Sequence, residues 1–262
     1  MAPSISSNDR VVGLPEGRLF TRVWLASVST LTPILLLHDS LGSAELWRDF
    51  PEALCAATGR SVIAYDRLGY GRSDAHPGLL ADDHIETESE TVALLLDQLG
   101  VDHFVAFGHS IGAEMAVACG SRLPQRCAAV IAECAQSWIE DKTLRTIAAA
   151  REQFNDPEQL EKLRRYHGDK AEWVLDAWHG TWFRPSMREW SILPELPNLR
   201  CPLLVLHGAD DKFVSLEQPR TMARSGGGPS RLEIIDGCGH IPHRERMDVV
   251  LDVVSDFLRD IE

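Results

Sequence analysis

The residues best suited to covalent chemistry in this sequence form a glycine-bounded serine, Gly108-His-Ser110-Ile-Gly112. An apolar run at residues 104–107 predicts a buried strand before it, and an alanine-rich segment at 113–119 predicts a helix after it. A serine on so sharp a strand-to-helix turn is strained, and flanking glycines let strand and helix approach closely. The turn also points the hydroxyl toward the positive end of the helix, where a developing oxyanion is stabilised. We therefore interpret Ser110 as a nucleophile.

A serine hydroxyl is a poor nucleophile at neutral pH, so it needs a base, and the base needs an orienting carboxylate. Ligands of an open α/β sheet bind beyond the carboxyl ends of its strands, so suitable partners should follow predicted strands. Two aspartates follow one late strand and two histidines follow the last; these are Asp210, Asp211, His240 and His243. The chain order Ser, Asp, His is the one expected for a serine on this kind of turn.

The elements that would hold these residues alternate between strand and helix. Residues 33–38, for example, are continuously apolar, as in strands buried on both faces of a parallel sheet. The predicted strands are 18–26, 33–38, 61–66, 104–107, 126–133, 202–207 and 231–235, and the predicted helices are 44–58, 86–99, 113–119 and 248–258. The alternation predicts an α/β fold with a mostly parallel central sheet and helices on both faces. Residues 1–10 are expected to form a loose tail.

The alternation stops between residues 136 and 199. Helical patterns at 141–153, 157–166 and 170–179 replace it, and this segment contains five of the seven tryptophans, at positions 138, 173, 178, 182 and 190. We predict a core of residues 1–135 and 200–262 with a helical cap insertion at 136–199. Most of the tryptophans should pack the cap helices together, and Trp138 and Trp182 are the candidates for contact with an apolar acyl or ring portion of a substrate.

The composition excludes some classes of function. Of 262 residues, 44% are hydrophobic and 25% are charged, and the net charge is −13, with no cluster of lysine and arginine to neutralise phosphates. We therefore expect no nucleic-acid partner. The six cysteines form no Cys-x-x-Cys pair, and no apolar run is long enough to span a membrane. These features favour a cytoplasmic protein with reduced thiols and no membrane partner.

Five motifs together resemble the α/β-hydrolase superfamily. They are the serine turn, the loop Asp66-Arg-Leu-Gly-Tyr-Gly-Arg-Ser-Asp74, the turn His38-Asp39-Ser40, the segment His207-Gly-x-x-Asp211-x-x-Val214 and the turn Gly239-His240. They are similar to the single-domain, cap-bearing branch of esterases, lactonases and carbon–carbon hydrolases. The resemblance covers essentially the whole chain outside the insertion and implies an α/β-hydrolase fold, but it does not identify a substrate.

Carried over by position, the resemblance implies that Ser110 is the nucleophile, His240 the base and Asp211 the orienting acid. The spacing around Asp211 favours it over Asp210. Glu133, at the end of the preceding strand, is a third candidate, since some members of the superfamily place the acid there. The alternative interpretation is that Glu133 is not catalytic and that its carboxylate faces solvent or pairs with the cap.

The remaining histidines have more ordinary expected roles. His243 lies beside a predicted helix start and is expected to be a surface imidazole rather than a base. His109 is expected to pack or hydrogen-bond locally beside the nucleophile, where it joins the substrate-binding candidates. His38 and His207 end buried strands and are expected to be structural.

An oxyanion hole requires two backbone N–H groups aimed at the carbonyl oxygen. One is expected from Ile111, and the resemblance puts the other at Ser40. Asp39 stands where the family commonly has glycine, which leaves backbone donors intact. Its carboxylate is a substrate-binding candidate that could discourage anionic substrates or pair with Arg67.

Three functions stay open. The first is a serine hydrolase that cleaves an ester or lactone through an acyl-enzyme, and the turn Asp39-Ser-Leu-Gly42 followed by Trp47 is similar to one in enol-lactonases. The second is a carbon–carbon hydrolase of ring-fission products with the same triad, and the third is a non-catalytic ligand receptor. Halide-releasing and epoxide-opening enzymes need Asp at position 110. We expect a small-molecule substrate, no cofactor and no metal, and a homodimer is one assembly that the sequence allows.

Overall fold

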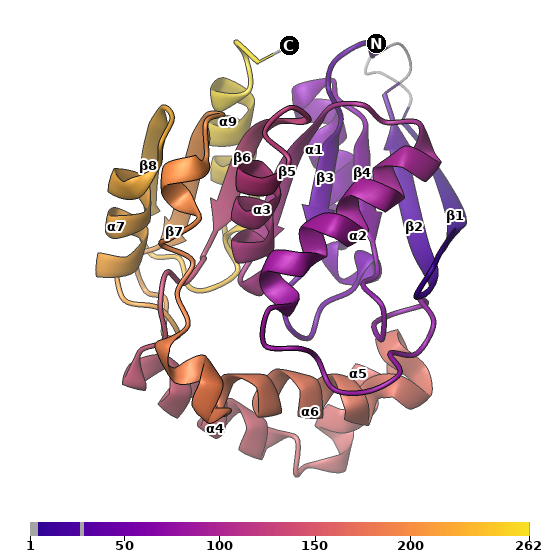
Figure 1. The fold of residues 1–262 in the computed structure, drawn as a ribbon, viewed down its shortest axis with the longest axis vertical. Helices are drawn as coiled ribbons and strands as arrows, with labels where there is room; N and C mark the ends of the chain where they lie inside the picture. The colour runs from indigo at the N-terminus through magenta and orange to yellow at the C-terminus, as the bar shows by residue number, and fades with distance from the viewer. Residues whose placement is uncertain (1–4, 27–28, 262) are drawn as a thin grey trace.

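An eight-stranded sheet forms the centre of the structure, a computed structural model that describes residues 5–26 and 29–261 (Figure 1). Its strands are β1 (Ser6–Leu14), β2 (Gly17–Leu25), β3 (Ile34–Leu37), β4 (Val62–Tyr65), β5 (Phe104–His109), β6 (Cys127–Glu133), β7 (Leu203–Gly208) and β8 (Ser230–Ile235). The spatial order is β1-β2-β4-β3-β5-β6-β7-β8. Pairing is antiparallel from β1 to β4 and parallel from β4 to β8, so the predicted mostly parallel sheet is confirmed.

Helices cover both faces of the sheet. In Figure 1, α2 (His84–Leu99), α3 (Ile111–Arg122) and α7 (Glu217–Ser225) lie in front, and α1 (Phe50–Thr58) and α9 (Met247–Phe257) lie behind. Successive strand residues point to opposite faces. Leu35 of β3 therefore packs in the apolar cluster that includes α2 and α3, whereas Leu36 packs in the cluster that includes α1 and α9.

The N-terminal segment corrects one expectation. From Ser6 onward it is the edge strand β1 and not a loose tail, whereas residues 1–4 lie outside the described residues. β1 pairs with β2 along its whole length, and Asp9 lies opposite Arg22, which donates to it at 2.6 Å. Of the nine residues in β1 only Val12 is buried, so β1 has no apolar pattern that would predict a strand. Pairing with β2 stabilises it instead.

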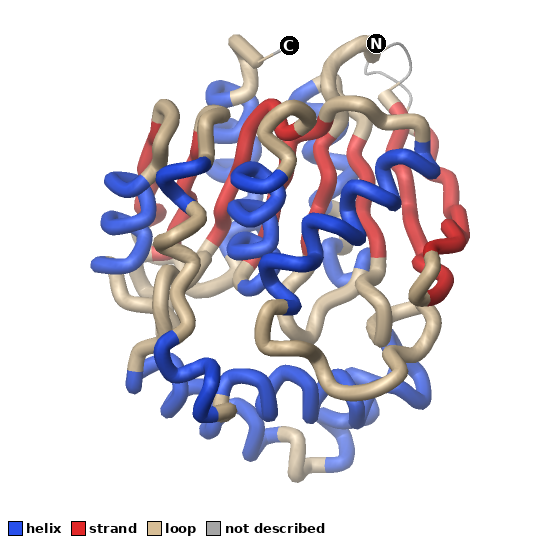
Figure 2. The backbone as a smooth tube through the Cα atoms, viewed as in Figure 1, coloured by secondary structure: helices blue, strands red, loops and turns tan. Residues whose placement is uncertain are grey.

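The segment 136–199 is helical and lies across one end of the sheet (Figures 1 and 2). It contains α4 (Asp141–Gln153), α5 (Pro157–His167) and α6 (Ala171–Trp182), close to the predicted spans, and the short 3-10 helices η2 (Gly168–Lys170), η3 (Pro185–Glu189) and η4 (Leu196–Asn198). Trp138 bridges to Ser191 and so joins the two ends of the segment. We call this segment the helical layer; its separation as a cap unit stays a prediction.

Two short elements complete the structure: the 3-10 helix η1 (Ala44–Trp47) and α8 (Pro242–Glu245). All six cysteines are free thiols, as expected. Among the described residues, no helix combines the length and the apolar character that crossing a membrane would require.

Candidate active site

Ser110 occupies the strained turn that its glycines predict. It lies between β5 and α3 with φ 53° and ψ −129°. A Cβ on Gly108 would lie 1.8 Å from the carbonyl oxygen of Gly112, and a Cβ on Gly112 would lie 2.0 Å from that of Leu37. Only glycine fits either position, so the two glycines allow α3 to start directly beside β5 and β3. The Ser110 backbone N–H donates to the Glu133 carbonyl at 2.9 Å, which fixes the turn against β6.

The structure brings His240 and Asp211 to this serine. His240 Nε2 lies 3.2 Å from Ser110 Oγ, and His240 Nδ1 lies 2.7 Å from Asp211 Oδ2. A carboxylate only accepts, so Nδ1 carries a proton toward Asp211, which leaves Nε2 as the ring nitrogen that can accept from the serine hydroxyl. Ser110 is half-buried and therefore reachable from solvent. This is the geometry required of a nucleophile, a base and an orienting acid.

Asp211 is held in its charged form by the loop after β7. Its Oδ1 accepts backbone N–H bonds from Phe213 at 2.7 Å and Val214 at 3.2 Å. Burial opposes the charge, but the hydrogen bond from His240, with these donors, lowers the pKa of Asp211 to about 2. Lys142 of α4 donates to the Asp211 backbone carbonyl at 2.9 Å, so the helical layer also fixes this loop. Its neighbour Asp210 is exposed and bonds Cys238 through its backbone N–H only.

The turn that carries His240 is supported from two sides. Glu245 of α8 accepts the N–H of Gly239 at 2.7 Å and of Ile241 at 3.0 Å, on either side of His240. From beneath, His109 Nε2 donates to the His240 carbonyl at 2.7 Å. These bonds hold the backbone of His240 while its ring stays free to face the serine.

His109 connects this turn to Asp39. His109 Nδ1 lies 3.5 Å from Asp39 Oδ2. Burial opposes a charge on His109, but the carboxylates of Asp39 and Glu133 raise its pKa, while the contact with His109 lowers the pKa of Asp39. The suggested pairing of Asp39 with Arg67 is wrong for the carboxylate, since Arg67 donates to the Asp39 backbone carbonyl at 2.8 Å.

The two expected oxyanion donors belong to residues close to the serine in the chain or at its cavity: Ile111 follows Ser110 directly, and Ser40 lines the same cavity. Ile111 is the first residue of α3, and Ser40 follows Asp39 in the turn after β3. Within the described residues neither backbone N–H has a hydrogen-bond partner. Both groups are therefore free to donate to a substrate oxygen, and their role stays a prediction.

A cavity of about 240 Å³ opens at Ser110 and His240, between the sheet and the helical layer. Its walls are mainly apolar and include Ile147, Phe154, Trp178, Trp182, Phe213 and Val214. Asp39, His109 and Trp182 line it, and their contact with a substrate stays a prediction. Trp138 does not; its backbone instead pairs with Ser191 and donates to Gln218. The apolar wall expected from Trp138 is supplied by Trp178.

His243 and Glu133 correct two further expectations. His243 is not a surface imidazole, since it is buried and its Nδ1 lies 2.5 Å from Glu133 Oε2. Glu133 is fully buried and faces neither solvent nor the helical layer; it also accepts the His243 backbone N–H at 2.9 Å. Glu133 therefore pairs with the second histidine of the turn and not with His240. Burial lowers the pKa of His243 despite this carboxylate.

In the part of the chain that the structure describes, two buried groups bring possible metal-ligand atoms within 4.8 Å of one another: His109, Glu133 and His243, and Cys134, His207 and Asp211. In each group the carboxylate already bonds a histidine, His243 for Glu133 and His240 for Asp211. Burial lowers the pKa of His207 to about 4, so its ring is neutral beside Asp211. The expectation of a metal-free site stays a prediction.

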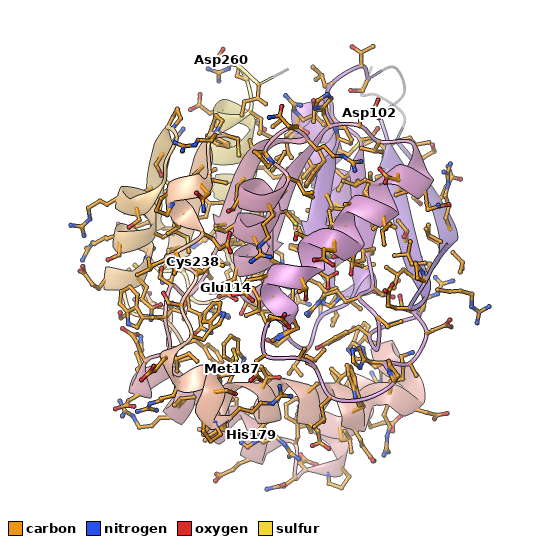
Figure 3. All side chains as sticks on the ribbon, in the orientation of Figure 1. Asp102, Glu114, His179, Met187, Cys238 and Asp260 are labelled. Atoms are coloured by element: carbon orange, nitrogen blue, oxygen red, sulfur yellow. The ribbon has the colours of Figure 1, made fainter. Side chains whose placement is uncertain are left out.

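Several residues at the cavity were not predicted. The ring centroids of Phe213 and His240 lie 4.7 Å apart. Glu114 and Gln136 also line the cavity. Figure 3 labels Glu114 at the end of α3 that faces the helical layer. Two features of the sequence could have indicated these residues. Glu114 lies one helical turn after Ser110, and Gln136 closely follows β6, at the end of a strand where ligand-binding residues gather.

Comparisons with known proteins agree with this architecture. A model of the alpha/beta hydrolase family matches residues 34–253. The human 1-acylglycerol-3-phosphate O-acyltransferase ABHD5 is 33% identical over 112 residues, which span 42% of this chain and only 31% of that relative. The solved 2-hydroxy-6-oxo-6-phenylhexa-2,4-dienoate hydrolase of Rhodococcus sp. strain RHA1 superimposes with a TM-score of 0.82 at 17% identity, covering 98% of this chain and 100% of that one. The enol-lactonase of Burkholderia xenovorans LB400 superimposes with a TM-score of 0.74 at 21% identity, covering 96% and 100%.

Proposed function

We propose that this chain, which belongs to the alpha/beta hydrolase family, is a serine hydrolase that cleaves a carboxylic ester or lactone of a small, partly apolar substrate. The observation that carries the proposal is the continuous contact from Ser110 Oγ to His240 and on to Asp211, at 3.2 and 2.7 Å. Ser110 and His240 both line the cavity described above, which can hold a small molecule.

In the proposed mechanism, Ser110 Oγ bonds to the acyl carbon while His240 Nε2 takes the hydroxyl proton. The carbonyl oxygen becomes an oxyanion that the N–H groups of Ser40 and Ile111 stabilise. His240 then protonates the departing alkoxide, which in a lactone stays attached to the acyl group. Water hydrolyses the acyl-enzyme with His240 again acting as the base. Asp211 holds the ring and stabilises the imidazolium.

The cavity supports a substrate with an apolar body. Trp178, Trp182 and Ile147 provide large apolar surfaces near the serine. The carboxylate of Asp39 lies at the same cavity, with its pKa lowered by His109, so it is charged at neutral pH. A second negative charge close to Asp39 would be repelled, which favours uncharged esters and lactones over substrates with an anion at that point.

A fluorophosphonate, which phosphonylates activated serines, tests the proposal directly. The wild-type protein should be labelled at Ser110, as located by peptide mass spectrometry. Ser110→Ala should abolish labelling and lower the kcat for a p-nitrophenyl ester by a factor on the order of 10⁶.

A matched control is Ser121→Ala, which changes a serine near the far end of α3 that bonds Glu195 and does not line the cavity. This variant should be labelled like the wild type. A folded wild-type protein that neither reacts with the fluorophosphonate nor hydrolyses any ester or lactone would contradict the proposal.

A carbon–carbon hydrolase is the second candidate. Its support is the likeness to the Rhodococcus dienoate hydrolase over nearly the whole of both chains. The same serine, histidine and aspartate could serve that reaction. Parallel assays on p-nitrophenyl esters, lactones and a ring-fission dienoate separate the two, since a carbon–carbon hydrolase would turn over the dienoate fastest.

A further inference from the structure

Two polar side chains that line the proposed catalytic cavity each have one oxygen without a hydrogen-bond partner among the described residues. Glu114 and Gln136 both line the cavity with Ser110. Within the described residues, Glu114 Oε2 and Gln136 Oε1 are buried and make no hydrogen bond. Buried polar atoms are almost always paired, because an unpaired one costs free energy on folding. Because both residues line the cavity at Ser110, a bound ligand is in a position to pair with these two oxygens.

The fold places these two groups at a defined distance from the nucleophile. Glu114 lies four residues after Ser110 along α3, which is about 6 Å along a helix axis. Gln136 follows β6, and its backbone N–H donates to Glu114 Oε1 at 2.8 Å. One carboxyl oxygen of Glu114 is thus fixed by the protein, and the other is left for something else.

The charge state of Glu114 determines what it can bind. The residue is 1% exposed. Burial raises the pKa of its carboxyl well above the usual range and Glu86 adds to this, while the Gln136 N–H and Arg67 act in the opposite direction. The protonated acid is favoured, so Glu114 offers an O–H donor, and the Gln136 amide can donate or accept.

The residues around Glu114 and Gln136 restrict the chemical class of the ligand further. The cavity walls near these groups are apolar, including Ile147, Trp178 and Trp182. No arginine or lysine lines this cavity among the described residues. His109 also lines the cavity, but its two ring nitrogens already face the Asp39 carboxylate and the His240 carbonyl. An anion would therefore find no unpaired cation in the lining, and a protonated carboxyl does not attract one.

We propose that Glu114 and Gln136 form a subsite that hydrogen-bonds an uncharged oxygen of the substrate, a ketone or a hydroxyl, about one helical turn from the scissile carbonyl. The subsite rests on the proposed function, since it places this oxygen on the ester or lactone that Ser110 attacks. The substrate class becomes an apolar acyl chain or ring with one neutral oxygen.

Paired substrates test the subsite by hydrolysis. The p-nitrophenyl ester of hexanoic acid is compared with oxohexanoate esters in which the ketone is moved along the chain. For the wild type, kcat/KM should be about tenfold higher for the best-placed ketone than for the plain ester. Glu114→Leu should bring this ratio to about one, whereas Glu114→Gln, which keeps a neutral donor of the same shape, should keep most of it. An unchanged ratio in Glu114→Leu would overturn the proposal.

A matched control is Glu88→Leu. Glu88 is a partly buried glutamate that accepts a 2.6 Å bond from Tyr65 and does not line this cavity. Its variant should show the wild-type ratio. A ratio lowered equally in Glu88→Leu would trace the effect to general loosening and would also overturn the subsite.

A binding measurement separates this proposal from the proposed hydrolysis. Calorimetry with Ser110→Ala compares methyl hexanoate, its oxo analogues and an analogue with an ammonium group in place of the ketone. The best oxo ester should bind about tenfold more tightly than the plain ester, and Glu114→Leu in the same background should remove the difference. This preference would support the subsite even if the wild type hydrolysed no ester. No preference, or tighter binding of the ammonium analogue, would overturn it.

Discussion

Two acid–histidine pairs lie within four residues of each other on one turn, and only one of them reaches the serine. His240 bonds Asp211 at 2.7 Å, and His243 bonds Glu133 at 2.5 Å. The His240 side chain is 18% exposed and its Nε2 faces Ser110, whereas the His243 side chain is 4% exposed. The His243 ring packs against Trp47 and Phe50, with centroids 4.6 and 5.3 Å away.

The difference shows that an acid–histidine hydrogen bond does not by itself make a base. Both rings are oriented by a carboxylate through Nδ1. What distinguishes His240 is the contact of its second nitrogen with the Ser110 hydroxyl at the edge of their shared cavity. His243 lines a neighbouring cavity instead, and its ring, which packs against aromatic side chains, contacts no hydroxyl among the described residues. We therefore propose that the His240 pair takes part in the chemistry. The Glu133 pair joins β6 to the turn that carries His240, and we propose that its role is structural.

The largest expected contrast is between the two histidines. His240→Ala should lower the kcat for a p-nitrophenyl ester by a factor on the order of 10⁴ to 10⁶, because the serine loses its base. His243→Ala should lower the kcat of the folded protein less than about tenfold. It should reduce the free energy of unfolding by about 3 kcal/mol, since Glu133 is left buried without its partner. Steady-state kinetics and urea unfolding of both variants measure the contrast.

The comparison would break if His243→Ala lost as much activity as His240→Ala while remaining folded. His243→Gln serves as the control, because its amide can still donate to Glu133. It should recover part of the lost stability. A His240→Ala variant that kept normal activity would remove the proposed base altogether.

Sequence reasoning succeeded where the signal was local. The turn at Ser110 needs two glycines within five residues, and the buried strands read directly as apolar runs. The pairing of Glu133 with His243 joins residues 110 positions apart, and nothing local to either residue indicates it. The strand β1 was not predicted for the same reason, since its stability depends on its neighbour β2 and not on apolar residues of its own.

The cavity lining was predictable only in part. Trp182 was expected there, but the choice between Trp138 and Trp178 depends on how the helices of the layer rotate. Rotation is set by packing between segments that sequence periodicity does not place in three dimensions. The unpartnered oxygen of Glu114 is likewise visible only once its neighbours are positioned.

The acid of each pair should also govern how the stability of the protein changes at low pH. The pKa of Asp211 is lowered to about 2 from an ordinary 3.8, so this group stabilises the folded state fully above about pH 4 and progressively less as pH falls toward 2. The contribution is about 2 kcal/mol. Asp211→Asn should therefore lose less stability than the wild type between pH 6 and pH 2. Urea unfolding across this range measures the difference.

The pKa of Glu133 is also lowered: burial opposes the shift, but the contacts with His243 outweigh it. Glu133→Gln should likewise flatten the loss of stability at acid pH. Its effect on kcat at neutral pH should be small beside that of Asp211→Asn, which leaves His240 without an anionic partner. Equal losses of kcat in the two variants would show that the buried pair also takes part in the chemistry.

The smallest expected effect concerns the support of the His240 turn. Glu245→Ala removes the acceptor for the N–H groups of Gly239 and Ile241, which flank His240. The carboxylate is exposed, so water can replace it at both donors, and kcat should fall only about threefold to tenfold. Glu245→Gln keeps one acceptor oxygen, so its kcat should lie between that of Glu245→Ala and that of the wild type.

The direction of the Glu245 effect distinguishes positioning from stability. If Glu245 positions the ring, its loss lowers kcat and leaves KM nearly unchanged, since the apolar walls proposed to bind the substrate do not include Glu245. The buried Glu133 pair, by contrast, should respond mainly through unfolding. A Glu245→Ala variant with a raised KM and an unchanged kcat would mean that the turn contacts substrate directly and that its geometry at His240 needs no outside support.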